Sequence, residues 1–219
     1  MESTCRIGAI MQQMTTIISD PKPAERWRKY EPMIRADLTA AGIDPDDPPT
    51  LVRALAKTVT RESRKGIFLT GGTGSGKSRR MQFLHEIKQI TMIPASDFGD
   101  AWSYSDGNPA EFREFCRVDS PRWSEIPATY NDLIIDDLGT EAEKYACYGN
   151  FCDVMRDKVI PMRYDAFIQR GARTHFTCNL SREQLRKRYG ERCYSRLCEM
   201  CAFIACNHPD RRMEPRAAR

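Results

Sequence analysis

The sequence predicts an α/β fold in which helices cover both faces of a parallel sheet. The first observation is a series of five short apolar runs, bounded by glycine or polar residues, which predict buried strands. The second is that helical stretches separate most of these runs, an alternation typical of parallel sheets. The third is size: 219 residues, with 41% hydrophobic and 29% charged residues, suit one domain, or one domain plus a short appendage, with a core of its own.

Two helices are expected in the first 60 residues. One covers residues 24–41, because Asp20 can cap it, prolines follow in its first turn, and Gly42 ends it. The proline-rich residues 44–49 predict a turn or linker. Apolar residues then recur at helical spacing from Leu51 to Val59. We therefore expect a small helical region over residues 1–60, a candidate for binding a partner, and a core over residues 61–219.

The core contains the strands. They are expected at residues 66–70, 89–93, 133–135, 174–178 and 201–206, with helices at 77–87, 95–104, 110–118, 143–170 and after Ser181. The helix over 143–170 is expected despite Pro161.

Composition excludes some classes of protein. No apolar run approaches the roughly 20 residues of a membrane span, and residues 1–10 lack the apolar segment of a signal peptide. Nine cysteines, an odd number, fit a reducing compartment better than a disulfide framework. We therefore expect a soluble, cytoplasmic protein with no membrane partner.

Charge is unevenly distributed along the chain. The net charge of +4 is too small to indicate a binding partner by itself. Residues 170–219, however, contain 12 Arg and Lys and only 5 acidic residues. This basic segment suits either a solvated surface or contact with a polyanion such as DNA or a nucleotide phosphate.

Residues 71–78 match the pattern G-x-x-x-x-G-K-[ST] between an expected strand and helix. In such a loop, glycines let successive N–H groups point at phosphate oxygens, and the helix start adds the positive end of its dipole. Lys77 can reach the β- and γ-phosphates, and the Ser78 hydroxyl can bind Mg²⁺. The sequence therefore predicts a site for a nucleoside triphosphate, formed by Gly71, Gly72, Thr73, Gly74, Ser75, Gly76, Lys77 and Ser78.

Two carboxylates, Asp136 and Asp137, follow the apolar run at residues 133–135. Alone, two acids after a strand are usually a helix cap or part of a loop. After a phosphate loop, a carboxylate is needed here for the metal ion. We predict that Asp136 holds Mg²⁺, directly or through water, and that Asp137 polarises the attacking water.

Further polar side chains lie after the fourth strand. The carboxamide of Asn179 can orient water or touch the γ-phosphate, or it can form a simple turn before the next helix. Arg192 and Arg196 share one helix face. An arginine can neutralise a transferring phosphoryl group, also from a neighbouring subunit. Spacing alone instead favours a surface salt bridge or a contact with the DNA backbone.

This order of motifs resembles the AAA+ ATPases of the DnaC/DnaI helicase-loader group, and the IstB transposition ATPases are similar. The resemblance covers about residues 60–208. It rests on the phosphate loop, Ile135-Asp136-Asp137-Leu138-Gly139, Thr177-Cys178-Asn179-Leu180, and Gly190-Glu191-Arg192 with Arg196-Leu197.

The resemblance implies an AAA+ core of five parallel strands in the order 5-1-4-3-2, sandwiched by helices and without a C-terminal lid. It implies ATP and Mg²⁺ as ligands, with slow hydrolysis stimulated by assembly. Asn179 becomes the first sensor, Arg196 the finger that completes a neighbour's site, and Arg192 its companion at the nucleotide. With Lys77 and Asp137, Asn179 and Arg196 form the expected catalytic set. The implied partners are a ring-shaped replicative helicase, single-stranded DNA and further copies of the chain.

Other interpretations stay open. The chain can be an IstB-like helper of a transposase, a phosphate-loop kinase for a small molecule, or a scaffold in which ATP only sets the assembly state. Cys198, Cys201, Cys206 and His208 have the chemistry of zinc ligands. Cys206 falls in an apolar strand, however, so buried thiols are the better interpretation.

Overall fold

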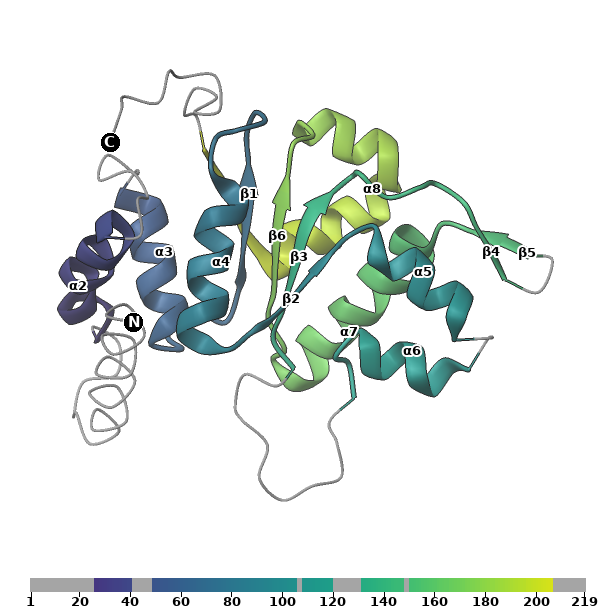
Figure 1. The fold of residues 1–219 in the computed structure, drawn as a ribbon, viewed down its shortest axis with the longest axis horizontal. Coiled ribbons are helices and arrows are strands. Elements are labelled where there is room, and N and C mark those ends of the chain that lie inside the picture. The colour runs from purple at the N-terminus through teal and green to yellow at the C-terminus, as the bar shows by residue number, and fades with distance from the viewer. Residues whose placement is uncertain (1–25, 41–48, 106–107, 120–130, 148–149, 207–219) are drawn as a thin grey trace.

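The computed structural model describes residues 26–40, 49–105, 108–119, 131–147 and 150–206. They form a central sheet with helices on both faces (Figure 1). The helices and strands are α2 (Arg26–Ala40), α3 (Pro49–Val59), β1 (Gly66–Thr70), α4 (Lys77–Lys88), β2 (Thr91–Pro94), α5 (Asp97–Tyr104), α6 (Pro109–Phe115), β3 (Leu133–Leu138), β4 (Tyr145–Cys147), β5 (Asn150–Cys152), the π-helix η3 (Met155–Val159), α7 (Ile160–Arg170), β6 (Thr174–Cys178), α8 (Arg182–Met200) and β7 (Cys201–Ala205).

The five-stranded sheet is parallel, and its strands lie in the order β2-β3-β6-β1-β7. Counted along the chain, these are strands 2, 3, 4, 1 and 5. Read from the opposite edge, this is the expected order 5-1-4-3-2. The element numbers differ from the expected ones because a two-stranded antiparallel ribbon, β4–β5, comes between β3 and β6 in the chain.

Alternating side chains of the strands form two hydrophobic clusters, one on each face of the sheet. On one face, Ile67, Leu69 and Ile134 pack with α3 and α4. On the other, Phe68 and Phe176 pack with α7, α8 and the α5–α6 pair. The sequence pattern therefore forms a three-layered sandwich, and the loops at the carboxyl ends of the strands lie along one edge of the sheet.

The region between β3 and α7 corrects the expected helix over residues 143–170. Its first part is the β4–β5 ribbon, and the helix starts only afterwards, with the π-helix η3 followed by α7. Pro161 lies in the first turn of α7. Because η3 runs directly into α7, this proline lies inside a continuous helical segment, where it has no N–H to donate and its ring clashes with the preceding turn. The wider π-turn just before it accommodates the residue.

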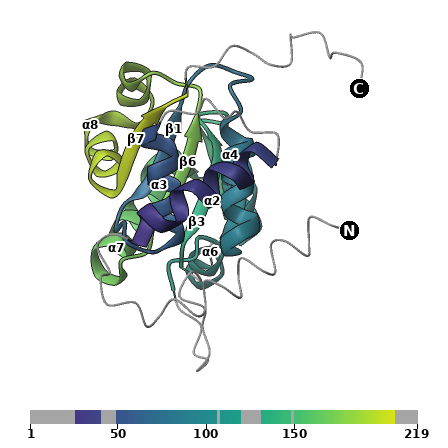
Figure 2. The same cartoon turned by 90° about the vertical axis from the view of Figure 1, so that its left-hand side faces the viewer.

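The helices α2 and α3 precede the sheet in the chain; α2 packs on α3, and α3 packs on α4 (Figure 2). Buried side chains of α3, including Leu51 and Leu55, belong to the same cluster as Ile67 of β1. The expected helix start at Asp20 lies outside the described residues. Of the turn expected at residues 44–49, residues 44–48 also lie outside them, and Pro49 is the first residue of α3. The division at residue 60 stays a prediction. No helix in the described segments is both long and apolar enough to cross a membrane.

Candidate functional site

The phosphate loop connects the carboxyl end of β1 to the first residue of α4, as expected. Gly76 has φ +82°, a left-handed conformation that glycine adopts without steric cost. At Gly71, a Cβ atom would lie 2.2 Å from the Cys206 carbonyl oxygen. Gly72, by contrast, has open space where its Cβ would be. The chain therefore needs glycine where the loop leaves the sheet and where it enters the helix.

The Lys77 ammonium group lies inside this loop. Its Nζ donates hydrogen bonds to the carbonyl oxygens of Gly71 at 2.9 Å and Gly72 at 2.8 Å, and to Ser75 Oγ at 3.3 Å. Burial lowers the pKa of Lys77, while nearby acidic groups, Asp137 and Asp136 among them, act in the opposite direction. The loop thus holds a buried cation whose present partners are neutral oxygens, which anionic phosphate oxygens can replace.

Arg80, on the first turn of α4, supports the loop, a role that the motif pattern does not predict. Its side chain is buried, and Nη1 donates a hydrogen bond to the Ser75 carbonyl oxygen at 2.7 Å. The same nitrogen would lie 2.6 Å from a Cβ atom at Gly76. A side chain at position 76 would therefore push the end of Arg80 away from this hydrogen bond, in addition to straining the backbone at its positive φ.

The two acids lie at the carboxyl end of β3, as expected. The hydroxyl of Thr177, on the neighbouring strand β6, donates to Asp136 Oδ1 at 2.5 Å and accepts from the Asp137 backbone N–H at 2.8 Å. Asp137 has φ +53°, which is uncommon for a residue other than glycine. Both acids are half-buried, so their side chains reach the edge of the sheet without being enclosed.

The sheet order brings the predicted residues together. The phosphate loop follows β1, Asn179 follows β6, and the acids end β3, and these three strands are neighbours. Asn179 is exposed and Ser78 is half-buried. A hydroxyl and carboxylates are hard oxygen ligands, the kind that Mg²⁺ prefers. The donor set at this edge, Ser78 with Asp136, therefore fits the metal ion that the sequence implies.

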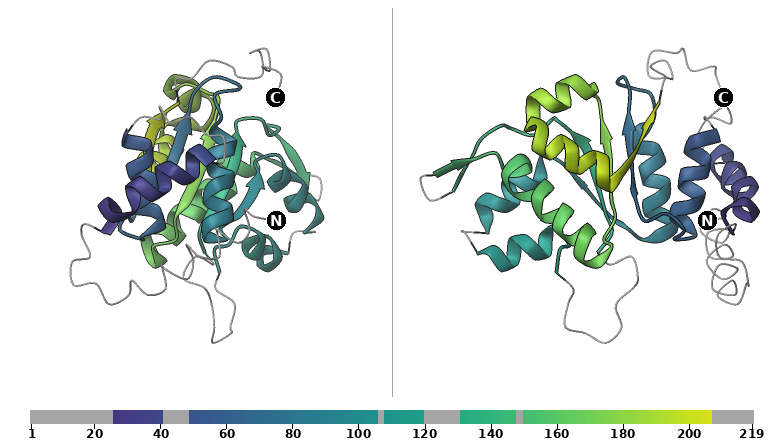
Figure 3. Two further views of the ribbon diagram at one scale, coloured as in Figure 1. Left: turned by 60° about the vertical axis from the view of Figure 1, so that its left-hand side comes forward. Right: turned by 180° about the vertical axis from the view of Figure 1, so that it is seen from behind.

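Arg192 and Arg196 lie elsewhere, on the second half of α8, beyond a kink at Gly190. This part of α8 leads to β7, whose first residue pairs with Gly66 at the amino end of β1 (Figure 3). The Arg196 guanidinium lies 5.0 Å from the centroid of the Tyr164 ring. Among the described residues, neither arginine forms a hydrogen bond or an ion pair with the phosphate loop. The structure therefore does not bring these two residues to the site of their own chain.

A buried polar network lies behind the loop that follows β3. Glu141 accepts hydrogen bonds from the Gly139 N–H at 2.8 Å and the Tyr189 hydroxyl at 2.5 Å, and it forms an ion pair with Arg188 at 3.1 Å. Arg188 also pairs with the buried Asp153. This network fixes the end of β3 against the first half of α8, next to an open pocket of about 740 Å³.

The cysteines give no support for zinc. Cys201 is buried and donates to the Thr174 carbonyl oxygen at 3.2 Å, and burial raises its pKa. Cys206 is also buried. In the part of the chain that the structure describes, no group of three or more His, Cys, Asp or Glu side chains could hold a metal ion. His208 lies outside the described residues.

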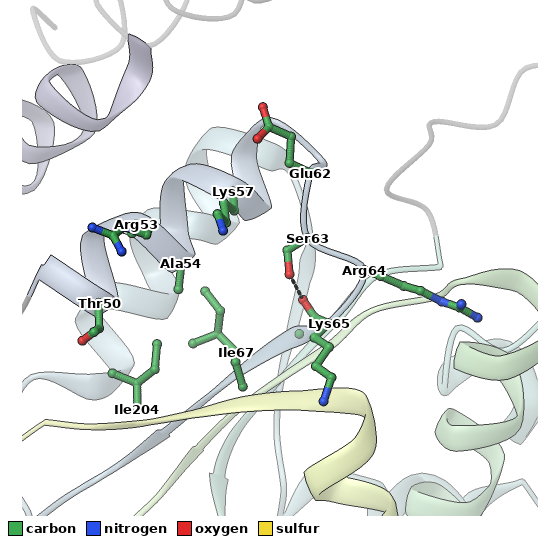
Figure 4. Close-up of a pocket in the computed structure, with 12 residues that line it drawn as sticks. Thr50, Arg53, Ala54, Lys57, Glu62, Ser63, Arg64, Lys65, Ile67 and Ile204 are labelled. Atoms are coloured by element: carbon green, nitrogen blue, oxygen red, sulfur yellow. Dashed lines mark hydrogen bonds between the residues drawn. The ribbon is translucent and has the colours of Figure 1, made fainter. Parts of the chain in front are cut away.

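A separate pocket of about 480 Å³ lies between α3 and the amino end of β1 (Figure 4). Its lining includes Arg53, Lys57, Lys65 and Ile67. The phosphate loop follows the other end of β1, so this pocket lies apart from the predicted site, and it contains none of the predicted site residues.

No protein-family model and no curated protein sequence matches the chain. Several solved structures, however, are similar to this chain. The structure titled "Crystal Structure of the DnaI" matches with a TM-score of 0.56 and 18% identity, over 75% of this chain and 88% of that one. A DnaC helicase loader matches with a TM-score of 0.51 and 20% identity, over 71% and 88%. AMPPCP-bound DnaA from Aquifex aeolicus matches with a TM-score of 0.54 and 14% identity, over 74% and 47%. At these identities the likeness shows the fold alone: the chain shares the fold of the DnaI, DnaC and DnaA structures.

Proposed function

We propose that this protein binds ATP with Mg²⁺ at the carboxyl edge of its sheet and hydrolyses it. The observation that carries the proposal is the convergence of the phosphate loop, Asp136, Asp137 and Asn179 on three neighbouring strands. The shared fold with a DnaA structure that holds AMPPCP supports nucleotide binding.

Each residue would have a distinct task. Lys77 exchanges its bonds to Gly71 and Gly72 for bonds to the β- and γ-phosphates and neutralises their charge. Ser78 and Asp136 would hold Mg²⁺, which when bound screens the charge that develops on the phosphate oxygens. Asp137 accepts a proton from the attacking water, and Asn179 orients that water against the γ-phosphate.

Arg196 would act on a neighbouring copy of the chain. Its place on the second half of α8 separates it from the phosphate loop of its own chain. Arg192, exposed one turn earlier, would contact the same neighbour. The proposal therefore includes assembly of several copies of the chain when they bind ATP or DNA.

A mixing experiment tests this arrangement. The Arg196→Ala variant keeps its phosphate loop and acids but lacks the arginine that would act on a neighbouring copy. The Asp137→Asn variant keeps that arginine but lacks the carboxylate that would accept the proton. Each variant alone should hydrolyse ATP at a small fraction of the wild-type rate, and activity should partly return in the mixture. No recovery at concentrations where assembly is shown independently would refute the action between subunits. Phosphate release without any added acceptor distinguishes hydrolysis from a kinase, and no turnover despite ATP binding would indicate a scaffold.

The biological role proposed is loading or remodelling of a replicative helicase on single-stranded DNA. The likeness to DnaI and to a DnaC helicase loader supports this role over the transposase helper. Residues 1–60 are proposed to bind the partner. Capture of partners from the native host with the full chain and ATP tests it. Recovery of a ring helicase would support the role, whereas recovery of a transposase would support the IstB-like alternative.

A further inference from the structure

The pairing of β3 with β6 is irregular at the two acids. Ile135 pairs with Phe176, and the next pair is Leu138 with Cys178. Between these pairs, β3 contains Asp136 and Asp137, whereas β6 contains Thr177 alone. One extra residue on one strand is a β-bulge, a feature that bends the strand and re-aims its side chains.

Thr177 compensates for the bulge. A bulge leaves a backbone N–H without its partner in the ladder, and here the Thr177 hydroxyl accepts from the Asp137 N–H at 2.8 Å. The same hydroxyl donates to Asp136 Oδ1 at 2.5 Å. A hydroxyl has one donor and two lone pairs, so it can serve both acids at once.

The contact also restrains both acids. Thr177 is fully buried, and its β-branched side chain has few rotamers open to it on a strand. Hydrogen bonds to an ionised acceptor are shorter and stronger than neutral ones. In the described part of the chain, the Thr177 bond to Oδ1 is the one hydrogen bond that the Asp136 carboxylate accepts.

We propose that Thr177 is a positioning residue for the metal site: it orients Asp136 toward Mg²⁺ through Oδ1 and holds the backbone of Asp137 in its left-handed conformation. The inference rests on the proposed function, because it assigns a task toward the metal ion that the ATP site would use. Thr177 acts through the two acids and does not itself touch the nucleotide.

The test compares three variants of the full chain. Thr177→Val has the same shape but neither donates nor accepts, and Thr177→Ser restores the hydroxyl. Thr174→Val is the matched control: its hydroxyl, at the amino end of the same strand, accepts from Arg163 Nε at 2.8 Å, away from the acids. For each variant we would measure AMPPCP affinity in EDTA, its dependence on Mg²⁺ concentration, ATP turnover and thermal unfolding.

Thr177→Val should bind AMPPCP in EDTA like wild type, because the phosphate loop is unchanged. Its half-saturating Mg²⁺ concentration should rise, and its turnover fall, by about 10- to 100-fold, the usual effect of removing a group that orients a metal ligand. Thr177→Ser should restore most of both properties, and Thr174→Val should change thermal stability but not the Mg²⁺ dependence.

Unchanged Mg²⁺ dependence in Thr177→Val, or an equal shift in Thr174→Val, would overturn the assignment. A serine variant as defective as the valine variant would overturn it as well. If wild type itself binds no AMPPCP, the proposed function fails, which is a different result from any of these.

Discussion

Replacing Asp132 with asparagine should destabilise the protein far more than the same change at Asp119. Asp132 begins the segment that enters β3, and its carboxylate accepts from Arg173 Nε at 3.0 Å, Nη2 at 2.6 Å and the backbone N–H at 2.9 Å. Both side chains are 2% exposed. Arg173 also donates to the Thr58 carbonyl oxygen of α3 at 2.9 Å.

The magnitude follows from burial. An asparagine at 132 would leave the buried Arg173 guanidinium without a counter-charge and would turn an amide N–H₂ toward its donors. Removing one partner of a buried ion pair costs about 3–5 kcal/mol. This is a large share of the about 5–15 kcal/mol that stabilises an ordinary domain.

Asp119 supplies the matched control. It accepts from Arg113 Nε at 2.7 Å and Nη2 at 2.8 Å, a geometry as good as that at Asp132, but the two side chains are 41% and 42% exposed. Exposed pairs contribute about 0–1 kcal/mol. Asp119→Asn should therefore lower the free energy of unfolding by no more than this amount.

Urea unfolding followed by circular dichroism measures both changes. A loss below about 1 kcal/mol in Asp132→Asn, or equal losses in the two variants, would refute the reasoning that burial decides the value of the pair.

Two further predictions concern Lys77 and His175. Lys77→Ala should weaken ATP binding by about 10- to 100-fold, because a charge-assisted hydrogen bond contributes about 1.5–3 kcal/mol. Lys88→Ala, at the far end of α4, is the control. Equal ATP affinities of the two variants in calorimetry would contradict the assignment of the phosphate loop. Burial, with Arg173 nearby, lowers the pKa of His175 to about 3, and its Nδ1 accepts from the Ile67 N–H. The folded state thus keeps this ring neutral while the unfolded state takes up a proton below about pH 6.5, so stability is lost as the pH falls. Between pH 7 and pH 5 wild type should lose about 2 kcal/mol more than His175→Gln in urea unfolding, and parallel pH profiles would count against the neutral ring.

Hydrophobic pattern was enough to predict the sheet. β1 and β6 have the expected bounds, and β7 differs by one residue. Strand β2 starts two residues later than expected, because Gln89 ends α4 in a left-handed conformation. The spacing of apolar residues does not reveal such local backbone geometry, so the ends of the strands were predicted less well than the strands themselves.

The β4–β5 ribbon could not be predicted in the same way, because contacts distant in sequence support it. The Ser103 hydroxyl of α5 donates to the Ala146 carbonyl oxygen at 3.2 Å. The Tyr145 ring packs where a side chain at Gly99 would be, since a Cβ atom there would lie 1.9 Å from it. Strands of three residues are also too short to show a period.

Buried polar groups were the main omission at the site. Arg80 and Glu141 look like surface charges in the sequence, because charged side chains are rarely buried unless paired. Thr177 belongs to the Thr177-Cys178-Asn179-Leu180 motif, but threonine is common in strands, so its contact with the two acids could not be predicted from the sequence. The motifs predicted the groups that would face a nucleotide. The groups that support them could be recognised only from their contacts with residues on other helices and strands.

The packing of α3 affects how the protein can be shortened for biochemistry. Leu51, Val52 and Leu55 of α3 are fully buried, and they cover Ile67 and Leu69 of β1. A chain that started at residue 61 would expose this apolar face to water and would be prone to aggregate. Ile34 and Leu38 of α2 are buried in the same cluster. Truncations meant to separate partner binding from nucleotide binding should therefore keep both α2 and α3 and remove only residues before α2. Loss of a partner in such a shortened protein could then be attributed to the missing residues rather than to a damaged core.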